Sequence, residues 1–385
     1  MPHAIAATFG DDVAFLKSHT EVVLLTDESG AAQVAVSPAW QGRVLTSTAS
    51  GDAGRSFGWI NRELIESGKK LPHMNGFGGE DRFWLGPEGG QFSIYFAKGV
   101  PFDFEHWFVP EVIDTKPFKL VEHSRDHATF TAKFHLENYS GTNFSVAVKR
   151  EVKLLKAEEA WRDLGVPAAE GVKLVGFESV NQISNAGNES WNKETGLLSI
   201  WILGMFTPAP RATVAVPIEA GAESELGRKV TSDYFGEVPS DRLKVADNAI
   251  FLKADGKYRS KIGVSPRRSL GKLAAYDADN HVLTIVQVTQ PAGVTEYVNS
   301  LWKLQDNPYG GDAINSYNDG PPAPGEKPMG PFFEMESSSP AVALAPEASI
   351  THTHRTIHLT GSEADLDRVA KAVVGLSLQQ IEHAF

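Results

Sequence analysis

The sequence of 385 residues contains no cysteine, no long apolar run and no cluster of basic residues. The absence of cysteine excludes disulfides, thiolate chemistry and zinc–thiolate sites. Without about 18 consecutive apolar residues, no membrane-spanning helix is expected, and the start MPHAIAATFGDDVAFL has no basic flank. Lys and Arg total 36 against 48 Asp and Glu, a formal net charge of -12, which argues against a nucleic-acid partner. We therefore expect a soluble protein without membrane or nucleic-acid partners, either cytoplasmic or, if a signal peptide has been removed, periplasmic or secreted.

What the sequence does contain is a succession of short strand-like segments, with 35 glycines and 22 prolines to form turns. Apolar and polar residues alternate most clearly in FSVAVKREVKLL (144–155) and THTHRTIHL (351–359), the pattern of a sheet with one wet face. Two shorter segments, Phe92–Phe96 and Val342–Leu344, are also expected to be strands. The order shows neither βαβ alternation nor an internal repeat, which favours one large antiparallel sandwich over a parallel sheet or a propeller.

Helical patterns are few. One lies at Ala157–Leu164, and a better one at Ser362–Phe385 starts with a capping box of Ser362 and Asp365 before an apolar stripe. The segment Gln305–Gly330 is rich in Asn, Asp, Gly, Pro and Tyr, which predicts a long loop. We thus predict an all-β fold in a single domain over residues 1–385, with few short helices, a loop insertion at 305–330 and a C-terminal helix at 362–385.

A dense row of acids and imidazoles is predicted in FFEMESSSPAVALAPEASITHTHRTIHL (332–359). If residues 345 and 346 form the turn of a hairpin, Glu336 lies opposite His354. Four side chains would then share one face: Glu334, Glu336, His352 and His354. A carboxylate beside an imidazole can supply a base and an acid near neutral pH, so the row fits a proton-transfer site or, with two histidine ligands, a metal site. The alternative is a solvated strand face with cross-strand ion pairs.

A second polar segment, GGEDRFWLGPEGG (78–90), places charged and aromatic side chains among glycines. The glycines let the backbone approach a ligand, Arg82 and the acids Glu80 and Asp81 offer hydrogen bonds, and Trp84 offers a face for stacking on a sugar ring. No Lys-Ser/Thr pair and no helix follow, so the segment does not fit a phosphate-binding loop. The alternative is a buried pair of Arg82 with Glu80 or Asp81 that ties a turn to the sheet.

The loop at 305–330 supplies further polar side chains for the same cleft. They are Asp312, Asn315, Tyr317, Asn318 and Asp319. Their oxygens could also hold calcium or another divalent ion, although the spacing is not that of an EF-hand. No other cofactor and no further metal ligand is predicted.

Three motifs, GGEDRFWLGPEGGQ, INSYNDGP and the E-x-E-SSSPA segment, allow a family to be named. With them the chain resembles, over nearly its whole length, the galactose mutarotase-like superfamily, an aldose 1-epimerase-like β-supersandwich, in a poorly characterised bacterial branch. The resemblance implies a sugar held on a concave sheet face. It implies too that a carboxylate, Glu334 or Glu336, takes the proton of the anomeric hydroxyl, while an imidazole from His73, His352 or His354 protonates the ring oxygen.

The resulting hypothesis is a carbohydrate-active enzyme acting on a mono- or oligosaccharide by carboxylate and histidine chemistry. It is either a mutarotase or, because its many carboxylates suit glycosidic cleavage as well, a glycoside hydrolase or lyase. The alternative is a carbohydrate-binding protein or sensor without catalysis. The candidate catalytic residues are Glu336, Glu334, His354, His352, Glu80 and Asp81. The candidate substrate-binding residues are Arg82, Trp84, Glu88, His73, Asn75, Asn315, Tyr317, Asn318 and Asp319.

Overall fold

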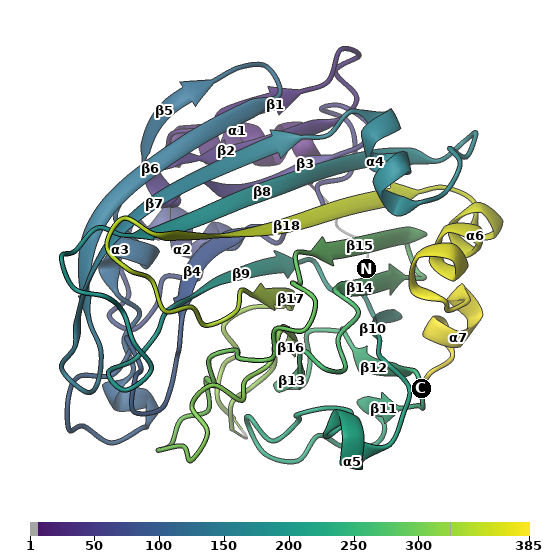
Figure 1. Cartoon of the computed structure of the whole chain (residues 1–385). Coiled ribbons are helices and arrows are strands. Elements are labelled where there is room, and N and C mark those ends of the chain that lie inside the picture. Colours follow the sequence, from purple (N-terminus) through teal and green to yellow (C-terminus); the bar gives the residue numbers. More distant parts are fainter. Residues whose placement is uncertain (1–6, 324) are drawn as a thin grey trace.

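The computed structural model describes residues 7–323 and 325–385, and in this part of the chain the strands form three antiparallel sheets. The largest sheet has ten strands in the order β11-β12-β10-β14-β15-β18-β8-β7-β6-β5. Its long strands β18, β8, β7 and β6 lie side by side as one broad layer (Figure 1). In the same order, the ten strands are Leu243–Val245, Ala249–Lys253, Ala212–Pro217, Lys272–Asp277, Val282–Val288, Ser349–Thr360, Lys173–Asn185, Asn143–Leu154, His127–Glu137 and Lys119–His123.

The other two sheets form the second layer of the sandwich. The five-stranded sheet has the order β13-β16-β17-β9-β4, with strands Ser260–Val264, Ile314–Asn318, Phe333–Ser338, Ser199–Phe206 and Arg82–Gly86. The three-stranded sheet β1-β2-β3 consists of Val23–Thr26, Gln33–Ser37 and Arg43–Thr48. A bridge between Val44 and Asp81 joins the two where β3 meets the start of β4.

Alternation in the sequence explains how the layers meet. In β7, every second side chain from Phe144 to Leu154 is buried, as the pattern FSVAVKREVKLL predicts. Strands β9 and β17 are buried on both faces. One face of these strands packs against the ten-stranded sheet, so the other must be covered by loops rather than by water.

Helices α4, α6 and α7 cover the outer face of the ten-stranded sheet. The helix predicted at Ala157–Leu164 is confirmed as α4. The helical segment predicted at the C-terminus is also confirmed, but it is divided into α6 and α7. The division occurs because Gly375 takes a left-handed conformation (φ 71°) that ends α6. Ser362 caps α6 by accepting a hydrogen bond from the amide of Asp365. The α-helices α1 to α7 are Phe9–His19, Arg62–Ser67, Glu111–Asp114, Ala157–Leu164, Glu223–Leu226, Glu363–Val374 and Leu378–Glu382; short 3-10 turns lie at Pro38–Trp40 and Phe104–His106. None of the helices in the described ranges is long and apolar enough to cross a membrane.

The predicted hairpin over residues 332–359 is wrong, because its two strands belong to different sheets. Strand β17 pairs with β16 and β9, and β18 pairs with β15 and β8, so both edges of each strand are already occupied. Glu336 therefore lies opposite Asn315 and Leu203 rather than His354. The expected loop at 305–330 also contains a strand, β16, and the segments Phe92–Phe96 and Val342–Leu344 form turns and irregular backbone instead of strands.

Candidate active site

The outer face of the five-stranded sheet gathers charged, amide and aromatic side chains from all five strands. Period-two geometry and the strand register bring them to one side. They are Arg82 and Trp84 of β4, Trp201 of β9, Glu334 and Glu336 of β17, Asn315 and Tyr317 of β16 and Lys261 of β13. Met335 and Ser337, which alternate with these glutamates along β17, point the other way, into the sandwich.

Two ion pairs organise this face. Arg82 Nη2 lies 2.9 Å from Glu334 Oε1, and Lys261 Nζ lies 3.0 Å from Glu336 Oε2. Both pairs run diagonally across the sheet, because Arg82 shares a row with Glu336 and Lys261 shares a row with Glu334. Only about a tenth of the Glu334 and Lys261 side chains is exposed, so the cluster reaches solvent through a narrow area.

Two tryptophans hold the ion pairs in place. Trp201 Nε1 donates a hydrogen bond of 2.9 Å to Glu336 Oε2, and Lys261 Nζ lies 4.8 Å from the Trp201 ring centre. The Arg82 guanidinium lies 4.2 Å from the Trp84 ring centre. These cation–π contacts keep both cations aimed at the carboxylates.

Burial sets the protonation of the cluster. It raises the pKa of Glu334 to about 7, against the lowering effect of Arg82. Burial also raises the pKa of the half-buried Glu88 to about 7. The positive charge of Lys261 lowers this pKa, and the negative charge of Glu336 raises it further. The pKa of Lys261 is raised because three carboxylates outweigh its desolvation, which keeps it an ammonium. Among the residues that the structure describes, Glu336 Oε1 finds no hydrogen-bond partner, so this oxygen is a free acceptor.

A loop between β10 and β11 lies against the same face through two aromatic residues. Tyr234 has its ring centre 5.6 Å from Lys261 Nζ, and its hydroxyl accepts a hydrogen bond of 3.0 Å from Asn315 Nδ2. Phe235 packs on the guanidinium of Arg259, 3.9 Å away, and lies edge-on to Tyr317. Sequence position alone did not connect this loop with the sheet.

Four of the predicted catalytic residues lie elsewhere, in a polar network between the sheets. Asp81 Oδ1 pairs with Arg150 at 2.6 Å, and Ser179 donates to its second oxygen at 2.7 Å. Glu80 accepts from Ser47 and contacts His358 Nε2 at 2.6 Å. The predicted alternative, an ion pair of Arg82 with Glu80 or Asp81, is therefore wrong, because Arg82 pairs with Glu334 instead.

The two predicted histidines complete this network. Ser337 Oγ lies 2.7 Å from His352 Nε2 and 2.9 Å from His354 Nδ1, so one hydroxyl links both rings across the sandwich. Burial lowers the pKa of His352 to about 3 and that of His354 to about 4, which keeps both neutral at ordinary pH. They lie on the opposite face of β17 from Glu334 and Glu336, so the predicted acid–imidazole row on one face is wrong.

Other predicted ligand-binding residues serve the loops around the cluster. His73 Nδ1 lies 2.7 Å from the carbonyl of Trp107, and Asn75 donates to Asp114 at 2.8 Å. Asn318 accepts from the amide of Gly256. A separate group comes from the predicted loop: Tyr317 donates to Asp319 at 2.8 Å, and the amide of Gly330 donates to the second Asp319 oxygen.

Within residues 7–323 and 325–385, no three His, Cys, Asp or Glu side chains are grouped as a metal site would require. The calcium hypothesis was based on the oxygens of the segment 312–319, but its two carboxylates, Asp312 and Asp319, accept hydrogen bonds from different partners. Asp312 accepts from Tyr234 and Thr231, and Asp319 accepts from Tyr317. A calcium requirement accordingly stays a prediction without a ligand set.

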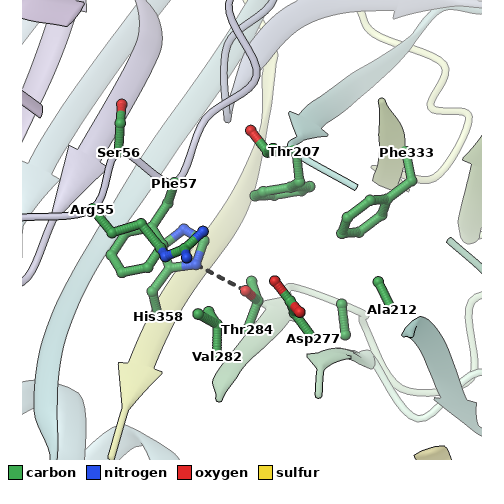
Figure 2. A pocket seen from close by; sticks show the side chains of 12 residues that line it. Arg55, Ser56, Phe57, Thr207, Ala212, Asp277, Val282, Thr284, Phe333 and His358 are labelled. Carbon is green, nitrogen blue, oxygen red and sulfur yellow. Dashed lines mark hydrogen bonds between the residues drawn. The ribbon is translucent and has the colours of Figure 1, made fainter. Parts of the chain in front are cut away.

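A small cavity between the layers is too small to hold a sugar. It lies beside His358, which stacks on Phe57 and shares a hydrogen bond of 2.8 Å with Thr284 (Figure 2). Its volume of about 30 Å³ suits a water molecule or two.

A model of a family of unknown function (DUF6786) matches residues 7–385. No curated protein matches the chain.

Solved structures resemble it in fold. One is a galactose mutarotase related enzyme from Lactobacillus acidophilus, with 10% identity and a TM-score of 0.50 over 89% of this chain and 98% of that one. Another is the Slr1438 protein from Synechocystis sp. PCC 6803, with 11% identity and a TM-score of 0.50 over 89% and 96%. A galactose mutarotase-like protein from Lactobacillus casei ATCC 334 has 12% identity and a TM-score of 0.46 over 88% and 100%. The predicted galactose mutarotase-like β-sandwich is confirmed.

Proposed function

This chain belongs to a family of unknown function, DUF6786, and we propose that it is a carbohydrate-active enzyme that interconverts the anomers of an aldose. The observation that carries the proposal is the pair of glutamates on β17, each held by its own cation on one aromatic face of the sheet. Fold alone does not establish a reaction, whereas the side chains of this site limit which chemistry is possible. The galactose mutarotase-like fold raises the expectation that the ligand is a sugar.

Glu336 is assigned as the base. Its Oε2 is occupied by Lys261 and Trp201, while its Oε1 lacks a partner among the described residues and can accept the anomeric hydroxyl proton. The Lys261 ammonium, 3.0 Å from Oε2, holds the carboxylate in place so that Oε1 can face the anomeric hydroxyl.

Glu334 is assigned as the acid. With its pKa raised to about 7 by burial, about half of this carboxyl is protonated near neutral pH, so it can give a proton to the ring oxygen. The C1–O5 bond then breaks as C1–O1 becomes a carbonyl, and the open chain rotates about C1–C2. Reclosure on the other face returns both protons. Glu334 takes the part that the sequence resemblance gave to an imidazole, since His352 and His354 face the sandwich interior.

A second candidate is hydrolysis of a glycosidic bond. Glu334 and Glu336 are two residues apart on one strand, which separates their backbone positions by about 7 Å. Inverting glycosidases place their two carboxyl groups about 6.5–9.5 Å apart, with one acid of raised pKa. The raised pKa of Glu334 suits this role as well.

A proton NMR time course of the anomeric region tests the proposal. Freshly dissolved aldoses and small oligosaccharides are followed with and without the protein, and with EDTA-treated controls. Exchange of α and β signals faster than in buffer is the expected result, whereas new reducing-end signals would favour the hydrolase. Line broadening without any change in rate would replace catalysis with a binding role.

The rate of anomer exchange, corrected for the buffer reaction, is expected to fall as the pH rises through about 7. The acid form of Glu334 is present below its raised pKa and is lost above it. The fall in rate above pH 7 is the alkaline limb of the pH profile. The Glu334→Gln variant should lose this limb together with most of the activity. Glu88→Gln is the matched control, since Glu88 has a similarly raised pKa but is given no proton-transfer role, and it should keep the limb. A wild-type rate that increases through pH 7 would contradict the assignment of Glu334 as acid.

A further inference from the structure

A second and larger cavity adjoins the cluster. Its volume is about 620 Å³, within the range of about 300–1,000 Å³ that small-molecule sites occupy. Segments far apart in the sequence line it: residues 226–234 from the end of α5 onward, residues 265–267 after β13, and residues 295–312 before β16. None of the proposed proton-transfer residues belongs to this lining.

Three of the four charged residues in the lining of this cavity contact other groups of the protein. Glu296 pairs with Lys193, Arg228 lies 3.7 Å from Asp233, and Arg267 donates to a backbone carbonyl. The lining also holds the phenol ring of Tyr309 and the amides of Asn299 and Asn307, which make local hydrogen bonds but keep further hydrogen-bonding positions for a ligand. Such a lining suits a neutral, polyhydroxylated ligand better than an anion.

The fourth charged residue, Asp312, has no Lys, Arg or His nitrogen within 4 Å in the described chain, although Lys261 and Arg228 lie near enough to act on its charge. Asp312 accepts hydrogen bonds from Tyr234 at 2.6 Å and from Thr231 at 3.3 Å. A carboxylate has about four acceptor positions, so two remain for hydroxyl groups of a ligand. Burial raises the pKa of Asp312 to about 6, which leaves it mostly ionised at neutral pH.

Tyr234 forms the wall between the cavity and the glutamate cluster. Its hydroxyl contacts Asp312 inside the cavity, while its ring lies 5.6 Å from Lys261 Nζ, the partner of Glu336. A sugar ring at the glutamates would thus have the cavity as its immediate neighbour.

We propose that this cavity is a subsite for a second sugar ring, so that the preferred substrate is a reducing disaccharide or the reducing end of an oligosaccharide. The inference rests on the proposed function, because that function places the first ring at Glu334 and Glu336. Asp312, Asn299 and Tyr309 bind the hydroxyls and the face of the second ring.

The test compares the binding of D-glucose with that of maltose, cellobiose and lactose by isothermal calorimetry, and the anomer exchange of the same sugars by NMR. At least one disaccharide is expected to bind about ten-fold more tightly than glucose. Thr295→Trp, which fills the cavity from an exposed lining position, should abolish that preference. Val294→Trp is the matched control, since Val294 is exposed but lies outside the lining, and it should keep the preference.

The outcomes separate the subsite from the reaction. Equal binding of glucose and all three disaccharides overturns the subsite while faster anomer exchange still supports the reaction. A disaccharide preference that survives Thr295→Trp also overturns it, because the second ring then lies elsewhere. Tight disaccharide binding that Thr295→Trp removes, without faster anomer exchange, supports the subsite and overturns the reaction. Absence of binding by every sugar overturns both.

Discussion

Glu336→Gln is expected to lower the rate of anomer exchange about a thousand-fold while the fold is retained. A positioned general base contributes roughly 10²–10⁴-fold to a rate, and glutamine keeps the shape of the side chain without its basicity. The amide can still accept the hydrogen bond that Trp201 now donates, at 2.9 Å, to Glu336. The measurement is the NMR exchange rate at saturating sugar, together with the thermal unfolding midpoint of the variant.

The control for this prediction addresses the ammonium that the substitution leaves behind. Lys261 has only about a tenth of its side chain exposed, so losing its carboxylate partner costs stability as well as activity. In the double variant Glu336→Gln/Lys261→Met the unpaired cation is gone, and stability should recover whereas activity should not. If the Glu336→Gln variant alone kept the wild-type rate, Glu336 would have no part in the mechanism.

Much of the fold could be predicted from the sequence because local patterns decide it. Alternation in residues 144–155 and the N-cap at Ser362 specify a strand and a helix start without any knowledge of distant partners. The break of the C-terminal helix at Gly375 was also visible as a glycine, but its left-handed conformation was not assigned. Strand Ile314–Asn318 was missed because its sequence, INSYN, is dominated by polar residues that usually mark loops.

The site was only half predictable because its partners depend on strand pairing across the whole chain. Arg82, Trp84 and the two glutamates of β17 were recognised from their local chemistry. The ion pairs that these residues form could not be predicted. Strand β17 pairs with β16 and β9, about 20 and 130 residues earlier in the sequence, rather than with β18, the strand that follows it. The signal for Lys261 was present in KYRSKIGV, where Arg259 just before β13 and Lys261 within it lie two residues apart, but a lone lysine carries little weight without its partner.

The histidines show why a composition of acids and imidazoles does not define a proton-transfer site. Strands β17 and β18 belong to different sheets, so the two histidines of β18 do not lie beside the two glutamates of β17. The histidines contact β17 through Ser337, whose side chain lies on the face of β17 opposite the glutamates. Together with Asp81 and Arg150 they form a buried polar network between the layers. Buried polar groups that satisfy one another fix how two layers dock, and this is the role we assign to the network.

Asp81→Ala is expected to lower the free energy of unfolding by about 3–5 kcal/mol. Both members of the Asp81–Arg150 pair are fully buried, and removing one leaves the guanidinium without its counter-charge in the interior. Ser179 would lose its acceptor in the same substitution. Urea unfolding followed by tryptophan fluorescence measures the change.

The control is Glu28→Ala, which removes an Arg–carboxylate ion pair at the surface. Glu28 lies 3.1 Å from Arg125, but more than half of each side chain is exposed, so a change within about 0.5 kcal/mol is expected. The nearly isosteric Asp81→Asn then separates structure from chemistry. Because Asp81 faces the interior network and not the glutamate cluster, a folded Asp81→Asn protein should keep its anomer exchange, and a folded but inactive one would return Asp81 to the catalytic residues.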